Sequence, residues 1–234
     1  MSMSTLPLPS EKAVVVRAMF DRIAPHYDRM NRLLTWGMDQ RWRRRTLDVL
    51  ALAPGERVLD LACGTGDFAE MCRDRGAEVV ATDYAAQMLH HADLRGLGGI
   101  LVRGDALSMP FADSVFDVAV CGFALRNFTS LPPVFAELAR VLKPGGRVGL
   151  LEVDRPAFAP IRLGHALYFE RVVPFVGRLL ADRKAYAYLP ASAAYLPPWP
   201  TMKSMLEEAG FECVRRERAM LGAVQRIDAV RRPT

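Results

Sequence analysis

"LDLACGTGDFAE", residues 59–70, decides the fold of this chain. Gly64 and Gly66 form a turn that follows an apolar run and precedes a helical pattern. Such a turn delivers an anionic or nucleoside cofactor from the end of a strand to the N-terminus of a helix. With Ala69 the stretch also fits the loose dinucleotide pattern G-x-G-x-x-G/A, and Asp83 lies near the expected distance downstream. The turn therefore predicts a cofactor site and leaves the class of cofactor open.

Apolar runs and helical patterns alternate along the chain after this turn. Strands are expected at 57–63, 78–83, 100–105, 115–123 and 147–153, with helices between them at 67–75, 85–95 and 131–142. A last helix is expected at 201–210, followed by two closing strands near 211–217 and 223–230. The "KPGG" at 143–146 is expected to form the turn that ends the third helix. The alternation predicts an α/β fold with a Rossmann-like, doubly wound, mostly parallel seven-stranded sheet.

The chain is long enough for one large core, so we expect a single domain over 1–234. Residues 11–50 show apolar residues at helical spacing, interrupted by a proline and a glycine, and predict an N-terminal helical cap. The cofactor-binding core is expected at 55–155. Residues 156–200, rich in proline, arginine and aromatic residues, interrupt the alternation and are interpreted as a helical insertion on the substrate side.

Composition excludes few classes of protein. The four cysteines show no CxxC pair and no metal-ligand spacing, so neither disulfides nor a metal site are expected. No signal peptide or membrane span is evident, which predicts a cytoplasmic protein. The net charge of +5 does not by itself distinguish a nucleic-acid partner, an anionic membrane surface and a solvated basic face. Without an RNA-binding motif or base-stacking aromatics, nucleic acid is not expected as a partner.

Acidic residues beside the glycine turn help to choose between cofactors. Asp60 and Asp67 flank the turn, where they disfavour a pyrophosphate and favour a ligand with an ammonium and a sulfonium, such as S-adenosylmethionine. Asp83 accepts hydrogen bonds from ribose hydroxyls with either cofactor. Asp105 is expected to end the third strand and to bind an adenine amino group, with the backbone N–H of Ala106 on a ring nitrogen. No phosphate-binding P-loop is present.

Longer stretches resemble a known family. "VLDLACGTGDF", "TDYAAQML", "GDALSMPFADSVFDVAVCGFALRNF" and "ELARVLKPGGRVGLLE" resemble class I S-adenosylmethionine methyltransferases in order and spacing. "MFDRIAPHYDRMNRLLTWGMDQRWRR" and "ALRN" resemble its UbiE/MenG type, which methylates a ring carbon of polyprenyl quinols. The candidate cofactor-binding residues are Asp60, Cys63, Gly64, Thr65, Gly66, Asp83, Tyr84, Asp105, Ala106 and Gly122.

The resemblance also implies the acceptor and the catalytic residues. It implies methylation of demethylmenaquinol or a similar prenylated quinol, with Tyr27, Arg126 and Asn127 around the quinol ring. Arg126 is expected to stabilise the developing phenolate and to orient a water, and Asn127 to hold the other oxygen. A long prenyl tail implies an apolar tunnel and peripheral membrane contact, for which the basic amphipathic segment 156–184 is the candidate. The segment fits equally well a cover over the active site whose arginines are solvated. A homodimer also fits.

Departures from the family pattern keep other functions open. Gly122 stands where the family usually has serine, Ala191 where it tends to have glutamate, and the C-terminal stretch keeps only Gly222 of a usual glycine pair and lacks the closing histidine. These differences favour, as an alternative, a methyltransferase for a soluble phenolic or polyketide acceptor. A protein of another class, binding the cofactor without turnover or binding NAD, is the third hypothesis.

Overall fold

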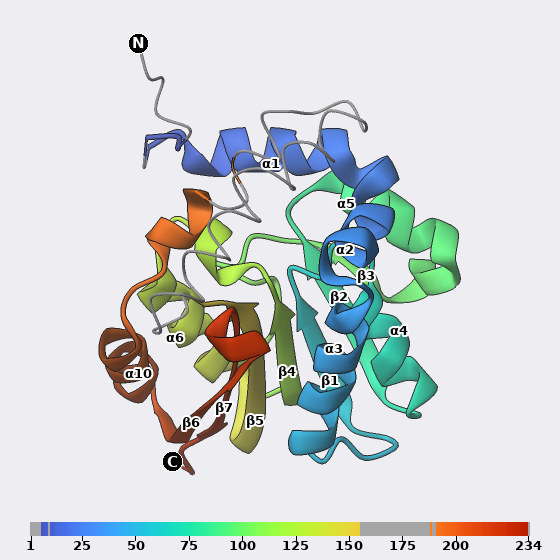
Figure 1. The fold of residues 1–234 in the computed structure, drawn as a ribbon. Coiled ribbons are helices and arrows are strands. Elements are labelled where there is room, and N and C mark those ends of the chain that lie inside the picture. Colours follow the sequence, from blue (N-terminus) through green and yellow to red (C-terminus); the bar gives the residue numbers. More distant parts are fainter. Residues whose placement is uncertain (1–5, 9, 155–187, 189–190, 234) are drawn as a thin grey trace.

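The computed structural model describes residues 6–8, 10–154, 188 and 191–233. Its strands are β1 (Arg57–Leu61), β2 (Glu78–Asp83), β3 (Leu101–Arg103), β4 (Phe116–Gly122), β5 (Leu142–Val153), β6 (Phe211–Ala219) and β7 (Val224–Arg231). They form one seven-stranded sheet in the order β3-β2-β1-β4-β5-β7-β6, in which β7 runs antiparallel to both of its neighbours (Figure 1). The predicted mostly parallel, doubly wound sheet is therefore confirmed.

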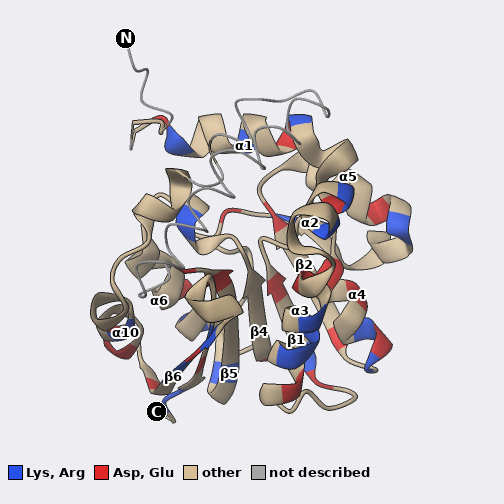
Figure 2. Ribbon diagram, viewed as in Figure 1, with Lys and Arg blue, Asp and Glu red and all other residues tan. Residues whose placement is uncertain are grey.

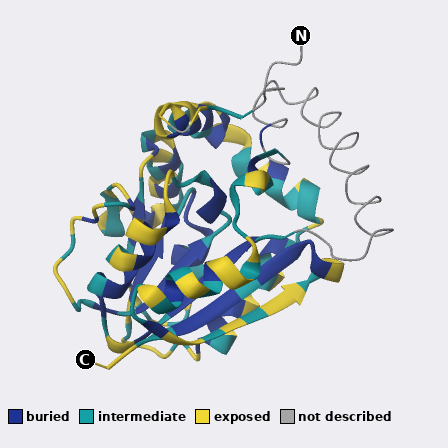
Figure 3. Ribbon diagram, turned by 90° about the vertical axis from the view of Figure 1, so that its left-hand side faces the viewer, coloured by how far each residue is buried: buried dark blue, intermediate teal, exposed yellow. Residues whose placement is uncertain are grey.

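Helices cover both faces of this sheet, because residues on the central strands alternate between two apolar clusters. The helices are α1 (Lys12–Ile23), α2 (Tyr27–Thr35), α3 (Met38–Val49), α4 (Asp67–Asp74), α5 (Ala86–Ala92), α6 (Leu131–Val141) and α10 (Trp199–Glu208). Val58 and Val118 pack with residues of α3 and α4, whereas Leu59 and Ala119 pack with residues of α6 and α10. In Figure 3 the buried strands lie in the centre, and the helices turn exposed residues outward.

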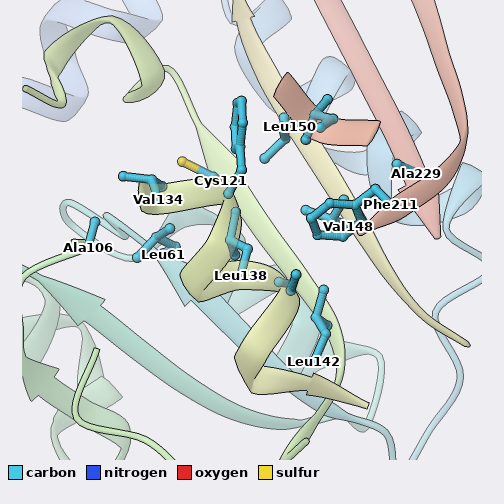
Figure 4. Packing of buried hydrophobic residues seen from close by; sticks show 14 of the residues in the cluster. Leu61, Ala106, Cys121, Val134, Leu138, Leu142, Val148, Leu150, Phe211 and Ala229 are labelled. Carbon is cyan, nitrogen blue, oxygen red and sulfur yellow. The ribbon is translucent and has the colours of Figure 1, made fainter. Parts of the chain in front are cut away.

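The larger cluster lies between α6 and the sheet. The apolar residues of α6 recur at helical spacing, and Val134 and Leu138 are fully buried. They pack over the sheet with Leu61 and Cys121 in the cluster that also contains Phe211 (Figure 4). Its density fixes the positions of β1 and β4, whose carboxyl ends flank the point at which the strand order reverses.

The predicted N-terminal cap is helical. Pro25 lies in the 3-10 turn Ala24–His26 that joins α1 to α2, and Gly37, with φ +71°, separates α2 from α3. The Nζ of Lys12 donates to the Phe128 carbonyl at 2.6 Å, which ties α1 to the loop after β4, and burial lowers the pKa of Lys12 to about 8. Among the described helices none is long and apolar enough to cross a membrane.

Several predicted boundaries were wrong: the first strand, for example, ends at Leu61 rather than at residue 63. The third strand ends at Arg103 rather than at residue 105, and the chain then turns through an isolated bridge between Asp105 and Ser108. The "KPGG" at 143–146 follows the end of α6 but lies within β5, where the register shifts between the pairs Phe116 with Leu142 and Val118 with Arg147. Gly145, at φ +76°, supplies the left-handed conformation that this bulge needs.

The basic amphipathic segment at 156–184, and with it most of the predicted insertion at 156–200, lies outside the described residues. At the end of that range, α10 already begins at Trp199, two residues before the predicted last helix. The single-domain organisation stays a prediction.

Candidate active site

The glycine turn between β1 and α4 is compact. Gly66, at φ +91°, is the N-cap of α4, and its N–H donates to the Cys63 carbonyl at 2.9 Å. A Cβ at Gly66 would lie 2.2 Å from the Cδ1 of Leu97, so glycine is required for space as well as for backbone conformation. The Thr65 hydroxyl donates to the Asp28 carboxylate of α2. The turn is thus held partly by the N-terminal cap.

Asp83 joins the turn to the end of β2, where the sequence places it. Its Oδ2 accepts a hydrogen bond from the Gly64 N–H at 2.8 Å, and its Oδ1 accepts from the Ala85 N–H at 2.8 Å. Burial raises the pKa of Asp83, and the backbone hydrogen bonds oppose that shift. A backbone hydrogen bond from Tyr84 also acts on this carboxylate. Because a carboxylate offers about four lone-pair sites, about one site remains for a hydroxyl donor of a ligand.

A first cavity, of about 130 Å³, opens above the carboxyl ends of β1, β2 and β4. Six of the predicted cofactor-binding residues line it: Gly64, Asp83, Tyr84, Asp105, Ala106 and Gly122. α1 contributes Val16, Arg17 and Phe20 to its wall, and the Arg17 guanidinium lies 5.5 Å from the Tyr84 ring centroid. The cap therefore closes the cavity from outside.

Two further polar groups face this first cavity. Asp105 follows β3 in a turn where its Oδ1 accepts from the Leu107 N–H at 3.0 Å, and its carboxylate remains exposed. Thr82 also lines the cavity, and its buried Oγ1 has no hydrogen-bond partner among the described residues. Thr82 was missed by the sequence analysis, because a threonine within a β-strand pattern carries no signal of its own.

Asp60 lies below the turn rather than in the cavity wall. It is 1% exposed, and its Oδ2 accepts from the Ala69 N–H of α4 at 2.9 Å. Burial raises its pKa to about 8, which opposes a permanent negative charge at neutral pH. Cys63, the other predicted residue of this stretch, packs with the same cluster as α4, and burial raises its pKa.

Asp67 does not have the role that we inferred from its position beside the turn. Its Oδ1 accepts hydrogen bonds from Arg32 at 2.6 Å and from Arg95 at 3.1 Å, and its Oδ2 lies 3.6 Å from Arg43 Nη2. Burial alone would raise the pKa of Asp67, but these arginines lower it. α3 and α4 lie side by side, and Figure 2 shows basic and acidic residues on both. Asp67 thus fastens the cap to the core.

A second cavity, of about 370 Å³, lies between the cap and the strands β5 and β7. Its polar lining includes Arg43 and Arg126, and Trp36, Trp42 and Met220 contribute apolar surface. The short helix of Met220–Gly222 lies on the same side of the sheet as α3 in Figure 1. Tyr27 and Phe123 line both cavities, so these two side chains form a shared wall.

Arg126 is buried in a dense polar cluster at this second cavity. It forms an ion pair with Glu152, which is fully buried, and its Nε donates to Ser192 Oγ at 3.1 Å. Its Nη1 also donates to the Phe123 carbonyl at 2.7 Å. Glu152 was missed by the sequence analysis, although an acidic residue within the apolar run of β5 is the signal of a buried partner.

The three predicted catalytic residues do not all face one cavity. Arg126 lines the second cavity, Asn127 lines the first, and Tyr27 lines both. Asn127 accepts a hydrogen bond from the Tyr188 hydroxyl at 3.2 Å. Burial raises the pKa of Tyr27, and the hydrogen bond with Asn31 and the nearby arginines oppose that shift, so the phenol stays protonated at neutral pH.

The chain is similar to known proteins in sequence and in fold. A model of the ubiE/COQ5 methyltransferase family matches residues 8–230. A demethylmenaquinone methyltransferase of Thermus thermophilus is 44% identical over 211 residues, which are 87% of this chain and 96% of that protein. One of Roseiflexus castenholzii is 41% identical over 230 residues, 95% of this chain and 96% of that protein. A Thermotoga maritima structure, described as a possible histamine N-methyltransferase, superposes with a TM-score of 0.65 at 20% identity over 92% of this chain and 99% of that one, which shows the fold.

Proposed function

This chain belongs to the ubiE/COQ5 methyltransferase family and uses S-adenosylmethionine, and we propose that it methylates a ring carbon of a prenylated quinol, demethylmenaquinol above all. The observation that carries the proposal is the pair of cavities that share Tyr27 and Phe123. One cavity has acidic groups at the ends of parallel strands, and the other has buried arginine side chains and an apolar lining. Two ligands in these cavities would meet at one wall, as methyl transfer requires.

The residues of the first cavity fit S-adenosylmethionine. The remaining lone-pair site of Asp83 accepts from a ribose hydroxyl. Asp105 accepts from the adenine amino group while the Ala106 N–H donates to the ring. Gly64, Gly122 and Tyr84 shape the space around the ligand. Cys63, Thr65, Gly66 and Asp60 act by forming and supporting the turn. The bound cofactor supplies an electrophilic methyl group.

The residues of the second cavity suit a phenolic ring. An acceptor carbon becomes electron-rich when a phenolic hydroxyl loses its proton, so a cationic group near that oxygen promotes the reaction. Arg126 is held in place by Glu152 and supplies the positive charge, also orienting a water that takes the proton. Tyr27, a neutral phenol in the shared wall, donates to a ring oxygen. Asn127 holds the second oxygen from the side of the first cavity.

Exposed apolar side chains at the second cavity support the idea of a long prenyl tail and of membrane contact. Trp36 and Met220 line the cavity and are 82% and 47% exposed, and the neighbouring Leu221 is 76% exposed. A Trp with apolar neighbours beside arginines is typical of a surface that lies on a bilayer. Peripheral membrane contact at this rim is therefore part of the proposal. A homodimer stays a prediction.

A product assay tests the proposed function. Purified protein is incubated with S-adenosylmethionine and a reduced demethylmenaquinone of short prenyl tail, and the ring-methylated product is measured by mass spectrometry. No product with the quinol, together with turnover of soluble phenols, would favour the alternative acceptor class. Sedimentation with anionic vesicles tests membrane contact: Trp36→Ser should bind less than the wild type, whereas Trp42→Phe, a change at a half-buried tryptophan, should bind equally.

A further inference from the structure

Arg43 of α3 is a buried cation in the described part of the second cavity wall. It is 5% exposed, and its Nη1 donates to Asp39 Oδ2 at 2.9 Å. Its Nη2 lies 3.6 Å from Asp67 Oδ2, so both terminal nitrogens face carboxylates. These contacts fix the plane of the guanidinium. Its Nε–H, by contrast, has no hydrogen-bond partner among the described residues.

Arg43 lies at the boundary between the two cavities, and its Nε is buried there. A Cβ at Gly122 would lie 3.8 Å from Nε, and Gly122 lines the first cavity while Arg43 lines the second. The guanidinium also lies 5.6 Å from the ring centroid of Phe68 and 5.4 Å from that of Phe123. These rings hold the cation but offer no hydrogen-bond acceptor in its plane. A buried donor of this kind is usually satisfied, so its partner is expected to be a ligand.

We propose that the Nε–H of Arg43 binds a negatively charged ligand oxygen at the wall between the cavities. Arginine stays charged at every working pH, and a charge-assisted hydrogen bond to an oxyanion is the strongest contact that this group can make. Two oxygens carry this chemistry: the carboxylate of the methyl donor, and the phenolate of the acceptor. The inference rests on the proposed function, and it assigns Arg43 as a ligand-binding residue beside Arg126.

Arg43→Lys is the variant that isolates this contact. Lysine keeps the positive charge between Asp39 and Asp67 but has no donor at the position of Nε. Arg44→Lys is the matched control, because Arg44 is the next residue of α3 and is exposed. Calorimetry gives the Kd of S-adenosylmethionine and of decarboxylated S-adenosylmethionine for each protein. The quinol assay gives kcat/KM for the acceptor at saturating cofactor, and a thermal midpoint verifies folding.

Each oxygen predicts a different result. If the donor carboxylate is the ligand, Arg43→Lys binds S-adenosylmethionine about tenfold more weakly or worse, while decarboxylated S-adenosylmethionine binds wild type and variant equally. If the phenolate is the ligand, cofactor binding is unchanged, kcat/KM falls about tenfold, and the acidic limb of the pH profile moves to higher pH.

The inference is overturned if Arg43→Lys stays within about twofold of wild type in both measurements, or if both cofactors lose affinity equally. The first result would mean that Arg43 is purely structural, and the second that it acts through the shape of the cavity. If the wild type methylates no quinol, the proposed function is wrong. The inference about Arg43 is then tested only by the Kd values of S-adenosylmethionine and its decarboxylated form.

Discussion

The Asp60→Asn variant is expected to remove a strong pH dependence from the stability of the fold. Burial raises the pKa of Asp60 from 3.8 to about 8, so the folded protein keeps this carboxyl protonated in the neutral range. The unfolded chain ionises it near pH ~4. Asparagine has the same shape and still accepts the hydrogen bond from the Ala69 N–H, but it does not titrate.

The magnitude follows from proton linkage. Between about pH 4 and about pH 8 the unfolded state binds about one proton fewer than the folded state at this residue. The stabilisation from the raised pKa is therefore complete below the unfolded pKa and is lost as the pH rises toward the folded one, by about 1.4 kcal/mol per pH unit. Between about pH 5 and about pH 7, Asp60→Asn should gain about 3 kcal/mol of unfolding free energy relative to wild type.

Urea unfolding at a series of pH values measures the difference in unfolding free energy between Asp60→Asn and wild type. The other titrating groups are the same in both proteins, so their contributions cancel. Asp117→Asn is the control. Burial acts to raise the pKa of Asp117, but the hydrogen bonds from Lys143 and from the Arg57 N–H lower it overall. The contribution of Asp117 to the unfolding free energy is therefore complete above its unfolded pKa, and it does not change between about pH 5 and about pH 7. If the difference in unfolding free energy between Asp60→Asn and wild type stays constant from about pH 5 to about pH 7, Asp60 is not protonated in the folded protein and the reasoning is refuted.

Three further substitutions test the site. Asp83→Ala should weaken binding of S-adenosylmethionine by about tenfold or more in calorimetry, because it removes the hydrogen-bond acceptor of the Gly64 N–H and of the ribose. Unchanged affinity would contradict this role. Arg126→Ala should lower turnover far more than cofactor affinity and, by leaving Glu152 unpaired, lower the unfolding free energy by about 3–5 kcal/mol; equal stability would show that the ion pair is dispensable. Gly122→Ala should cost about 1–3 kcal/mol of unfolding free energy because its Cβ would lie 3.0 Å from the Phe68 ring, and Phe68→Leu should recover part of that loss.

Local patterns in the sequence predicted the fold and the first cavity. β1, β2 and β4 are short apolar runs next to helical patterns, and parallel strands place their carboxyl ends at one edge of the sheet. Asp83 could be predicted for that reason, since its place at the end of β2 fixes its proximity to Gly64. The boundary of β3 could not, because the turn at Asp105 depends on a bridge formed only in the folded chain.

Contacts between side chains that lie far apart in the chain could not be predicted from the sequence. Asp67 was interpreted from its neighbours in the chain, but its charge is neutralised by arginines from α2, from α3 and from the segment that follows α5. In the sequence, Arg43 is one of four arginines within residues 41–45. Its spacing to Thr46, Leu47 and Leu50 does place it on the buried side of α3, so helical periodicity was the available signal.

Tyr27 and Phe123 line both cavities, so a ligand in one cavity that contacts this wall is an effector of a ligand in the other. A ligand that orders these two side chains in one cavity sets the shape of the next, and the free energy of this coupling is the same in both directions. Any gain in acceptor affinity that the cofactor causes must therefore return as an equal gain in cofactor affinity when the acceptor is bound. Substitution of either side chain changes that coupling as well as the two separate affinities, so neither residue belongs to one ligand alone.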